Sequence, residues 1–188
     1  MVAKRNFAFL FAPHFHPAFK NIGPLRKELG VRTLFNLLGP MINPARPSHL
    51  LMGVARPELV PLLADTLSQS ALYADSVRTA LKAGVDAVVC GAGNYDELTP
   101  MGPATAMLLH NGKVSPLELD PARFGFQNCT PEDLAVESRE EAVEVLRRLL
   151  DGEGPRPMRD MVALNVGLAI FLMEEELPLD VCMARARE

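Results

Sequence analysis

Residues 7–44 read FAFLFAPHFHPAFKNIGPLRKELGVRTLFNLLGPMINP, and this stretch decides the fold. Its apolar run Phe7–Ala12 predicts a strand covered on both faces, because strands of parallel sheets pack against helices on either side. Pro13 ends the run. Pro17 then suits the first turn of a helix that reaches about Leu29, since proline is favoured at that position. A buried strand followed by a helix indicates an α/β protein.

The second half of this stretch contains several prolines and glycines that end or kink helices and strands. Pro24 predicts a kink inside the helix, and Gly30 suits its C-terminal cap. The short run Leu34–Leu38 is compatible with a helix or a strand. Gly39-Pro40 and the proline-rich turn at 43–47 end it. The segment therefore combines a buried strand, a short basic helix and tight turns.

The chain continues with further strands and helices in alternation. His49–Val54 is apolar and predicts a second strand, and Pro57 opens a helix with leucines at helical spacing. Val85–Cys90 is short and β-branched, which favours a third strand. Strand, helix and strand in this order predict a parallel sheet with right-handed crossovers.

An antiparallel hairpin follows. Ala104–His110 and Lys113–Leu119 flank Asn111-Gly112, which is a strong signal for a two-residue turn. The predicted fold class is therefore α/β, with a mainly parallel sheet, an antiparallel hairpin and flanking helices. We expect residues 1–188 to form a single domain.

Three helices are predicted at the C-terminal end. Ser138 and Glu141 form a plausible capping box for a helix that reaches Leu150 and has an apolar stripe. Met158–Met173 is almost wholly apolar, which predicts a buried helix. Leu179–Arg187 predicts a short amphipathic one.

Composition excludes several classes of protein. Of the 188 residues 48% are hydrophobic and the mean hydropathy is +0.10, which excludes a mostly disordered chain. No apolar run approaches the roughly 18 residues that a membrane helix needs, so we expect no membrane partner. The first apolar run is too short for a signal peptide, and we expect a cytoplasmic protein. Cys90, Cys129 and Cys182 are odd in number and widely spaced, which predicts reduced thiols.

Charge is unevenly distributed along the chain. Residues 1–60 hold eight Lys and Arg side chains and two acids, a net charge of +6, which leaves −10 for residues 61–188. The basic residues are scattered and few aromatic residues lie among them, so no nucleic-acid partner is expected. A pocket for a small anion matches this pattern better.

One candidate site follows the third strand, in GAGNYDEL, residues 91–98. A dinucleotide-binding loop is disfavoured, because Asp96 occupies the third glycine position of GxGxxG and no helix follows. Adjacent Asp96 and Glu97 just past a strand end could bind Mg²⁺ that bridges to a phosphate. The alternative is a solvated acidic turn, because Asp and Glu are ordinary turn residues.

A second candidate site lies in the opening segment. Phe19 and Arg26 are seven residues apart and would share one face of a regular helix, with His16 at its N-terminal end. With Pro13 and Phe19 as walls, His16 as donor and Arg26 as carboxylate partner, they could bind an aromatic acid. The alternative is a core Phe, a surface Arg and a loop His.

Three motifs resemble one known family. They are FAPxxHPA at 11–18, VRxxFNLLGPxxNP at 31–44 and DELxxxGP at 96–103, in this order. Together they resemble the anthranilate phosphoribosyltransferases, which are nucleoside phosphorylase-like phosphoribosyltransferases with a glycosyltransferase family 3 catalytic domain. This resemblance implies transfer of phosphoribosyl from phosphoribosyl pyrophosphate to anthranilate, in tryptophan biosynthesis.

The resemblance also implies roles for the candidate residues. Asp96 and Glu97 match the acidic pair that binds Mg²⁺ and engages the diphosphate. Pro13, His16, Phe19 and Arg26 match the anthranilate pocket, in which Arg26 pairs with the carboxylate. Such a transfer needs positioning and charge neutralisation rather than a nucleophilic side chain, so no catalytic residue is assigned.

The chain departs from the family in two ways. It resembles only the C-terminal half, without the N-terminal helical domain or the Gly-Thr-Gly-Gly-Asp loop that binds phosphoribosyl pyrophosphate. In addition, 74–84 suggests an extra helical piece before the acidic pair. We expect an inactive or partner-dependent chain that forms a homodimer or pairs with a complementing N-terminal half. A non-catalytic aromatic-acid-binding or subunit module, and a related enzyme acting on a nucleobase, are the alternatives.

Overall fold

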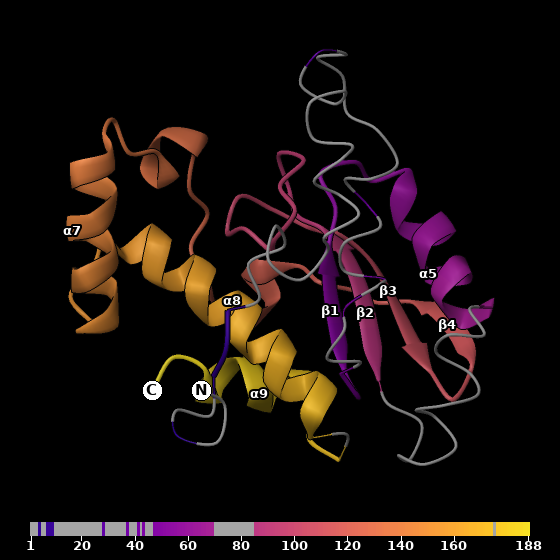
Figure 1. The fold of residues 1–188 in the computed structure, drawn as a ribbon. Coiled ribbons are helices and arrows are strands. Elements are labelled where there is room, and N and C mark those ends of the chain that lie inside the picture. Colours follow the sequence, from indigo (N-terminus) through magenta and orange to yellow (C-terminus); the bar gives the residue numbers. More distant parts are fainter. Residues whose placement is uncertain are drawn as a thin grey trace. The chain divides into compact units, whose positions relative to one another are not determined.

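The computed structural model describes residues 47–69, 85–174 and 176–188, together with Lys4, Phe7–Phe9, Glu28, Leu37, Met41 and Asn43 (Figure 1). Contacts divide the chain into two units, Met1–Pro47 and Ser48–Glu188. In the first unit, Phe7–Phe9 lie in no helix or strand, so the predicted strand is not formed at these three positions. Glu28 is helical, as predicted. The single domain over 1–188 stays a prediction.

The second unit is built on a four-stranded sheet in the order β1-β2-β3-β4 (Figure 1). The strands are β1 Leu50–Gly53, β2 Asp86–Cys90, β3 Thr105–His110 and β4 Lys113–Pro116. β1 and β2 are parallel, whereas β2–β3 and β3–β4 are antiparallel. The α/β class and the hairpin are confirmed, and among the described strands two of the three pairs are antiparallel.

The hairpin turn follows its local sequence. Asn111 and Gly112 have φ of 52° and 74°, the left-handed values that a type I′ turn requires at both central positions. The turn fixes the register, so that His110 pairs with Lys113 and Leu109 with Val114. Because β3 runs back beside β2, the sheet changes from parallel to antiparallel at that pair.

Helices cover both faces of the sheet. α5 Leu59–Gln69 contacts β2, β3 and β4 and buries Val60, Leu63, Ala64 and Leu67 (Figure 1). Of its predicted apolar stripe, Leu62 is exposed. On the other face, side chains of β2 and β3 form the main core with α8 Arg156–Met173 and α9 Leu179–Arg185. All five residues of β2 are buried, as expected for a strand covered on both faces.

The helix α8 Arg156–Met173 is buried on one face only. Ala163, Leu164, Gly167, Leu168 and Leu172 are buried. The opposite face exposes Val162, Val166 and Met173, so the predicted buried helix is covered on one face only. The misleading signal was composition: this helix is apolar nearly all round, and only tertiary packing decides which side is covered.

The helix α7 Arg139–Leu150 begins as predicted at Ser138, whose Oγ accepts a hydrogen bond from the Glu141 amide at 3.1 Å. The reciprocal bond is displaced by one residue, because the Glu141 carboxylate accepts from the amide of Glu137 at 2.7 Å. No residue of α7 is buried. Its apolar stripe therefore covers little of the core, and Leu146 is 56% exposed.

Two short 3-10 helices, η1 Pro121–Phe124 and η2 Pro131–Leu134, connect the hairpin to α7. The three cysteines are free, with Cys90 and Cys182 buried, as predicted. In the part of the chain that the structure describes, no helix has the length and apolar character needed to cross a membrane.

Candidate metal and substrate site

The acidic loop, Gly91–Thr99, follows β2 directly. Its first part turns tightly, because the Gly91 amide donates to the Tyr95 carbonyl at 2.8 Å and the Asn94 amide donates to the Gly91 carbonyl at 3.1 Å. Asn94 adopts a φ of 63°, a left-handed value that asparagine tolerates better than most residues. The turn places Asp96 and Glu97 beyond the carboxyl ends of the parallel strands β1 and β2. Ligands of α/β proteins commonly bind at this edge.

Two glycines allow the backbone of the acidic pair to approach the sheet. A Cβ on Gly53, the last residue of β1, would lie 1.4 Å from the carbonyl oxygen of Asp96. A Cβ on Gly91 would lie 2.0 Å from the carbonyl oxygen of Glu97. Neither position accepts a side chain without moving the loop. The carbonyls of both acids therefore lie directly against the ends of two strands.

The far end of the acidic loop is held by hydrogen bonds. Asn165 of α8 accepts from the Leu98 amide at 3.0 Å and donates to the Leu98 carbonyl at 2.9 Å. The Thr99 hydroxyl donates to the Ala92 carbonyl at 3.0 Å. Leu98 and Thr99 are buried. Asn165 is not among the site residues predicted from the sequence, although it is the only amide side chain in the otherwise apolar run from Met161 to Met173.

The two carboxylates are exposed and close in sequence, and their electrostatics favour a cation. Partial burial, and then the negative charge of Asp96, raise the pKa of the Glu97 carboxyl above its ordinary value. Burial, followed by the charges of Glu58 and Asp96, likewise raises the pKa of the Cys90 thiol. A bound cation would relieve the repulsion between the two carboxylates. Carboxylate oxygens are the ligands that Mg²⁺ prefers, so this donor set fits that ion.

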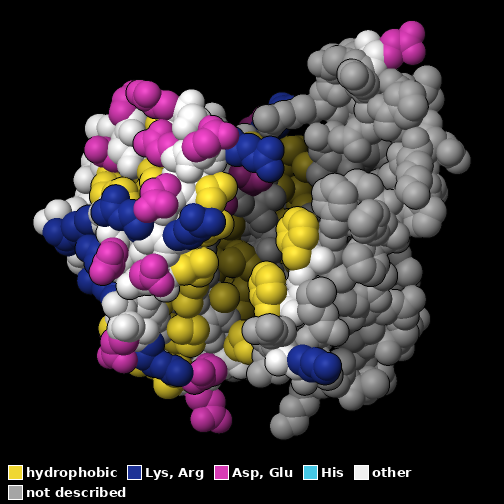
Figure 2. Space-filling view, turned by 60° about the vertical axis from the view of Figure 1, so that its left-hand side comes forward, with side chains coloured by type: hydrophobic (Ala, Val, Ile, Leu, Met, Phe, Trp, Pro, Cys, Tyr) yellow, Lys and Arg dark blue, Asp and Glu magenta, His cyan; other side chains and the backbone are white. Residues whose placement is uncertain are grey.

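The acidic loop borders an apolar cavity of about 580 Å³. Asp96 and Glu97 lie on its wall, and its remaining lining comes mainly from β1 and α8. Its residues are Leu51, Gly53, Val89, Leu134, Leu149, Met158, Met161, Val162, Asn165, Val166 and Ala169. Figure 2 shows hydrophobic side chains gathered in a band, with charged side chains of the described residues along its left side. Two acids beside an apolar wall could bind a cation next to an apolar group.

The structure brings together Asp96 and Glu97 of the predicted site residues. Pro13, His16, Phe19 and Arg26 lie outside the described residues, as does the predicted extra piece at 74–84. Among the residues that the structure does describe, no three His, Cys, Asp or Glu side chains gather as a metal cluster. A cation at Asp96 and Glu97 would thus complete its coordination with substrate oxygens or water.

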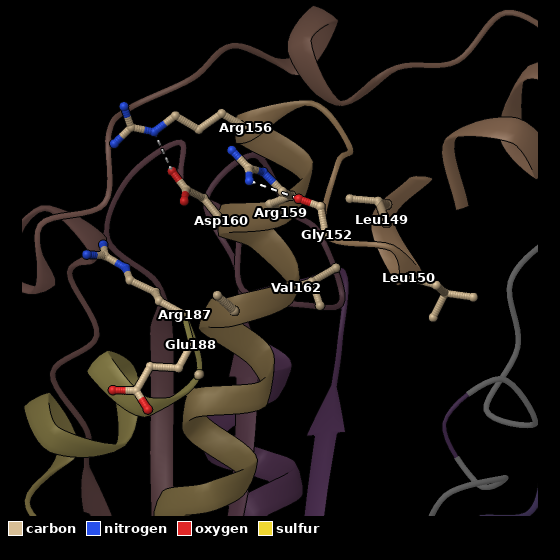
Figure 3. A pocket seen from close by; sticks show the side chains of 11 residues that line it. Leu149, Leu150, Gly152, Arg156, Arg159, Asp160, Val162, Arg187 and Glu188 are labelled. Atoms are coloured by element: carbon tan, nitrogen blue, oxygen red, sulfur yellow. Dashed lines mark hydrogen bonds and ion pairs between the residues drawn. The ribbon is translucent and has the colours of Figure 1, made fainter. Parts of the chain in front are cut away.

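A second cavity, of about 440 Å³, lies where α7 ends and α8 begins (Figure 3). Arg156 pairs with Asp160 at 3.6 Å, and Arg159 donates to the Gly152 carbonyl at 3.1 Å. Arg187 stacks on Phe126, 3.7 Å from the ring centre. Each guanidinium already contacts a group of the chain. These arginines therefore connect the segments around the cavity, and we do not assign an anion-binding site to them.

The whole chain matches one known protein family. The model described as "Glycosyl transferase family, a/b domain" matches residues 1–188. The chain belongs to this family. The family resemblance of its motifs is confirmed, and the matched part of its relatives is their C-terminal half.

The relatives of this glycosyl transferase family member are named anthranilate phosphoribosyltransferases. One from Nitratidesulfovibrio vulgaris is 59% identical over 192 residues, which cover 100% of this chain and 54% of the relative. One from Oleidesulfovibrio alaskensis is 52% identical over 188 residues, again covering 100% and 54%. The chain spans about half the length of the relatives that it matches.

Solved structures agree with the sequence relatives. The anthranilate phosphoribosyltransferase of Thermus thermophilus is 36% identical with a TM-score of 0.75, covering 96% of this chain and 50% of that one. The Saccharomyces cerevisiae enzyme in complex with PRPP and Mg is 26% identical with a TM-score of 0.79, covering 97% and 48%. Its complex with 4-fluoroanthranilate has a TM-score of 0.82 at 26% identity, covering 97% and 50%.

Proposed function

We propose that this chain supplies the Mg²⁺-binding and acceptor-binding part of an anthranilate phosphoribosyltransferase. The reaction joins phosphoribosyl from phosphoribosyl pyrophosphate to anthranilate and releases pyrophosphate, in tryptophan biosynthesis. The observation that carries the proposal is the acidic pair, Asp96 and Glu97, seated against the ends of two parallel strands in a member of this glycosyl transferase family. The yeast relative solved with PRPP and Mg supports the choice of ion and donor.

In the proposed reaction Asp96 and Glu97 bind the ion, which neutralises charge on the departing diphosphate. The chain holds in place the backbone that carries the two carboxylates, because the Asp96 and Glu97 carbonyls pack against Gly53 and Gly91, and Asn165 bonds to Leu98. Fixed charges act on a developing charge without first having to reorient, which is the usual source of such stabilisation. The apolar wall beside the pair offers a surface for an apolar part of a substrate.

The acceptor pocket is proposed to consist of Pro13, His16, Phe19 and Arg26. The support is the FAPxxHPA motif and the spacing of Arg26, together with a relative solved with 4-fluoroanthranilate. A guanidinium binds a carboxylate through two parallel hydrogen bonds, which suits Arg26 as the partner of an aromatic acid. Arg26→Ala should abolish anthranilate binding in calorimetry, and unchanged affinity would remove Arg26 from the pocket.

We further propose that activity needs a second polypeptide or copy. The chain spans about half of the length of these relatives. In the described sheet β1 pairs only with β2, and the described face of α8 beside it is apolar. An apolar helix face of this kind favours association with another protein surface. A cytoplasmic location is proposed with this biosynthetic role.

The deciding experiment measures pyrophosphate release with anthranilate, phosphoribosyl pyrophosphate and Mg²⁺. It is run on the chain alone, and again after adding the N-terminal half of the Nitratidesulfovibrio relative. We expect no turnover alone and turnover after addition. Turnover by the chain alone would refute the requirement for a partner. No turnover in either case, with anthranilate still bound, would favour the alternative of a non-catalytic aromatic-acid-binding module.

A further inference from the structure

We propose that Asn165 is the positioning residue of the acidic pair, so that this α8 side chain sets where Asp96 and Glu97 present their carboxylates to Mg²⁺. The inference rests on the proposed function for its metal, and on hydrogen bonds of the structure for its geometry. Asn165 reaches the acidic loop across 67 residues of sequence and makes two bonds to one residue, Leu98.

Both polar atoms of the Asn165 side chain are hydrogen-bonded. Its Oδ1 accepts from the Leu98 amide, and its Nδ2 donates both to the Leu98 carbonyl and, at 2.8 Å, to the Met161 carbonyl one turn earlier in α8. The bond to Met161 lies within α8 and restricts the rotamer of Asn165. It therefore orients the plane of the side-chain amide toward the loop. Asparagine is a poor residue inside a helix, because it competes with the backbone for hydrogen bonds. Its bonding to the loop gives this position a role that an apolar residue cannot fill.

The bonded amide belongs to the peptide unit that joins Glu97 to Leu98. The N–H of this unit donates to Asn165, while its carbonyl oxygen is the Glu97 oxygen that lies against Gly91. The same planar peptide is thus held on both sides, by α8 and by the end of β2. Because a fixed peptide plane fixes the adjoining Cα, it restricts the directions in which the Glu97 side chain can point.

The preceding residue is held by the other strand. The Asp96 carbonyl oxygen lies against Gly53 at the end of β1, where a Cβ would stand 1.4 Å away. Leu98, which follows the pair, is only 2% exposed and belongs to the core that includes Leu164 and Leu168 of α8. The two carboxylates are exposed while the backbone beneath them contacts three elements. Partners of this kind outside the ligand set commonly change metal affinity when they are removed.

The test compares Asn165→Leu and Asn165→Ala with wild type and with Leu164→Ala. Leu164 neighbours Asn165 and is 1% exposed, so its truncation lowers stability without removing a bond to the loop. Two quantities are measured by nuclear magnetic resonance on the full chain. The first is amide hydrogen exchange at Leu98 relative to Val88 in β2. The second is the dissociation constant for MgCl₂, from the amide shifts of Asp96 and Glu97.

We expect both Asn165 variants to exchange the Leu98 amide at least about 10-fold faster relative to Val88, and to bind Mg²⁺ about 10-fold more weakly. In Leu164→Ala, exchange should accelerate at both amides together, with Mg²⁺ affinity of the folded protein unchanged. An Asn165 variant that frees the Leu98 amide but keeps wild-type Mg²⁺ affinity would overturn the positioning role. Unchanged exchange of the Leu98 amide would show that the hydrogen bonds of Asn165 do not hold the acidic loop.

The same data separate this inference from the proposed function. If wild type shows no shift with Mg²⁺ at Asp96 or Glu97, the metal assignment fails, and the positioning role fails with it. The exchange ratio would still report whether Asn165 holds the loop. If Mg²⁺ binds to wild type and binds equally to the Asn165 variants, only the positioning role fails. Asn165→Ala keeps the test informative if Asn165→Leu does not fold.

Discussion

The acidic loop and helix α7 differ in a way that their local sequences do not suggest. The acidic loop, Gly91–Thr99, consists largely of turn residues, yet its backbone contacts β1, β2 and α8. α7 is a regular, well-capped helix of 12 residues, yet none of them is buried. Regular hydrogen bonding and a fixed position are therefore separate properties. Tertiary contacts decide the second, so a loop can be held in place more firmly than a helix.

The largest expected effect comes from Gly53→Ala. A Cβ 1.4 Å from the Asp96 carbonyl oxygen cannot be accommodated, so either the acidic loop or the end of β1 must move. We expect a loss in the free energy of unfolding at or above the upper end of the roughly 1–3 kcal/mol typical of an overpacked core, because a backbone carbonyl must move. Chemical denaturation measures it.

Gly112→Ala is the matched control for that change. A Cβ on Gly112 meets nothing within 4 Å, although its φ of 74° is strained for alanine. The expected loss is about 1–2 kcal/mol, from backbone strain alone. Equal losses in the two variants would show that the contact between Gly53 and the acidic loop is not tight.

Truncation of Leu98 and of Leu146 compares the two regions directly. Leu98 is 2% exposed, and Leu146 of α7 is 56% exposed. Leu98→Ala should cost about 2–5 kcal/mol, the usual range for a buried leucine. Leu146→Ala should change stability by less than about 0.5 kcal/mol. Thermal unfolding of both variants measures the difference, and a large effect at Leu146 would mean that α7 is covered by a partner.

The cap of α7 predicts an intermediate effect. Ser138→Ala removes the acceptor of the Glu141 amide, which should cost about 1 kcal/mol. Ser138→Asp retains an acceptor at the same position and should keep most of the stability. If the alanine variant unfolds at the wild-type denaturant concentration, α7 contributes nothing to cooperative unfolding.

The smallest effect concerns Glu97 and depends on pH. Since folding raises the pKa of Glu97 above the ordinary 4.5, the folded state holds this proton more tightly than the unfolded state. Stability is therefore lost as pH rises through 4.5 and the folded pKa, and the penalty is fully present at neutral pH. Glu97→Gln should raise Tm slightly at pH 7 and leave it unchanged below pH 4.

Mg²⁺ should act in the opposite direction on the Tm difference between wild type and Glu97→Gln. Binding of a cation favours ionised Glu97, so saturating Mg²⁺ should raise the Tm of wild type more than that of Glu97→Gln. Leu146→Ala, which leaves both carboxylates in place, serves as the control and should respond to Mg²⁺ as wild type does. Equal Mg²⁺ responses in wild type and Glu97→Gln would remove Glu97 from the ion's ligands.

Local signals in the sequence predicted much of the fold. Asn111-Gly112 predicted the hairpin because its left-handed conformations are a property of these two residues. Ser138 predicted the start of α7, because capping involves only the first turn. Burial along α7 and α8 could not be predicted in this way, because it depends on what packs against each helix.

In the candidate site, too, the residues with local sequence signals were predicted and those that depend on distant contacts were not. Asp96 and Glu97 were found because they follow a strand and match a family motif. Gly53 and Asn165 were missed because their partners lie far away in sequence. Both left a signal, since a glycine inside a strand marks a close backbone approach and a single amide in an apolar helix needs a hydrogen-bond partner.

The central claim is that the acidic loop binds the ion, and Mn²⁺ tests it most directly. Titrating Mn²⁺, a paramagnetic substitute for Mg²⁺, should broaden the amide signals of Gly53, Gly91 and Asp96–Leu98 before all others. Asp96→Asn/Glu97→Gln should abolish this broadening. Glu132→Gln/Asp133→Asn, which changes the adjacent exposed acids of η2, should preserve it. Broadening centred on any other part of the chain, or retained when Asp96 and Glu97 are replaced, would contradict the assignment.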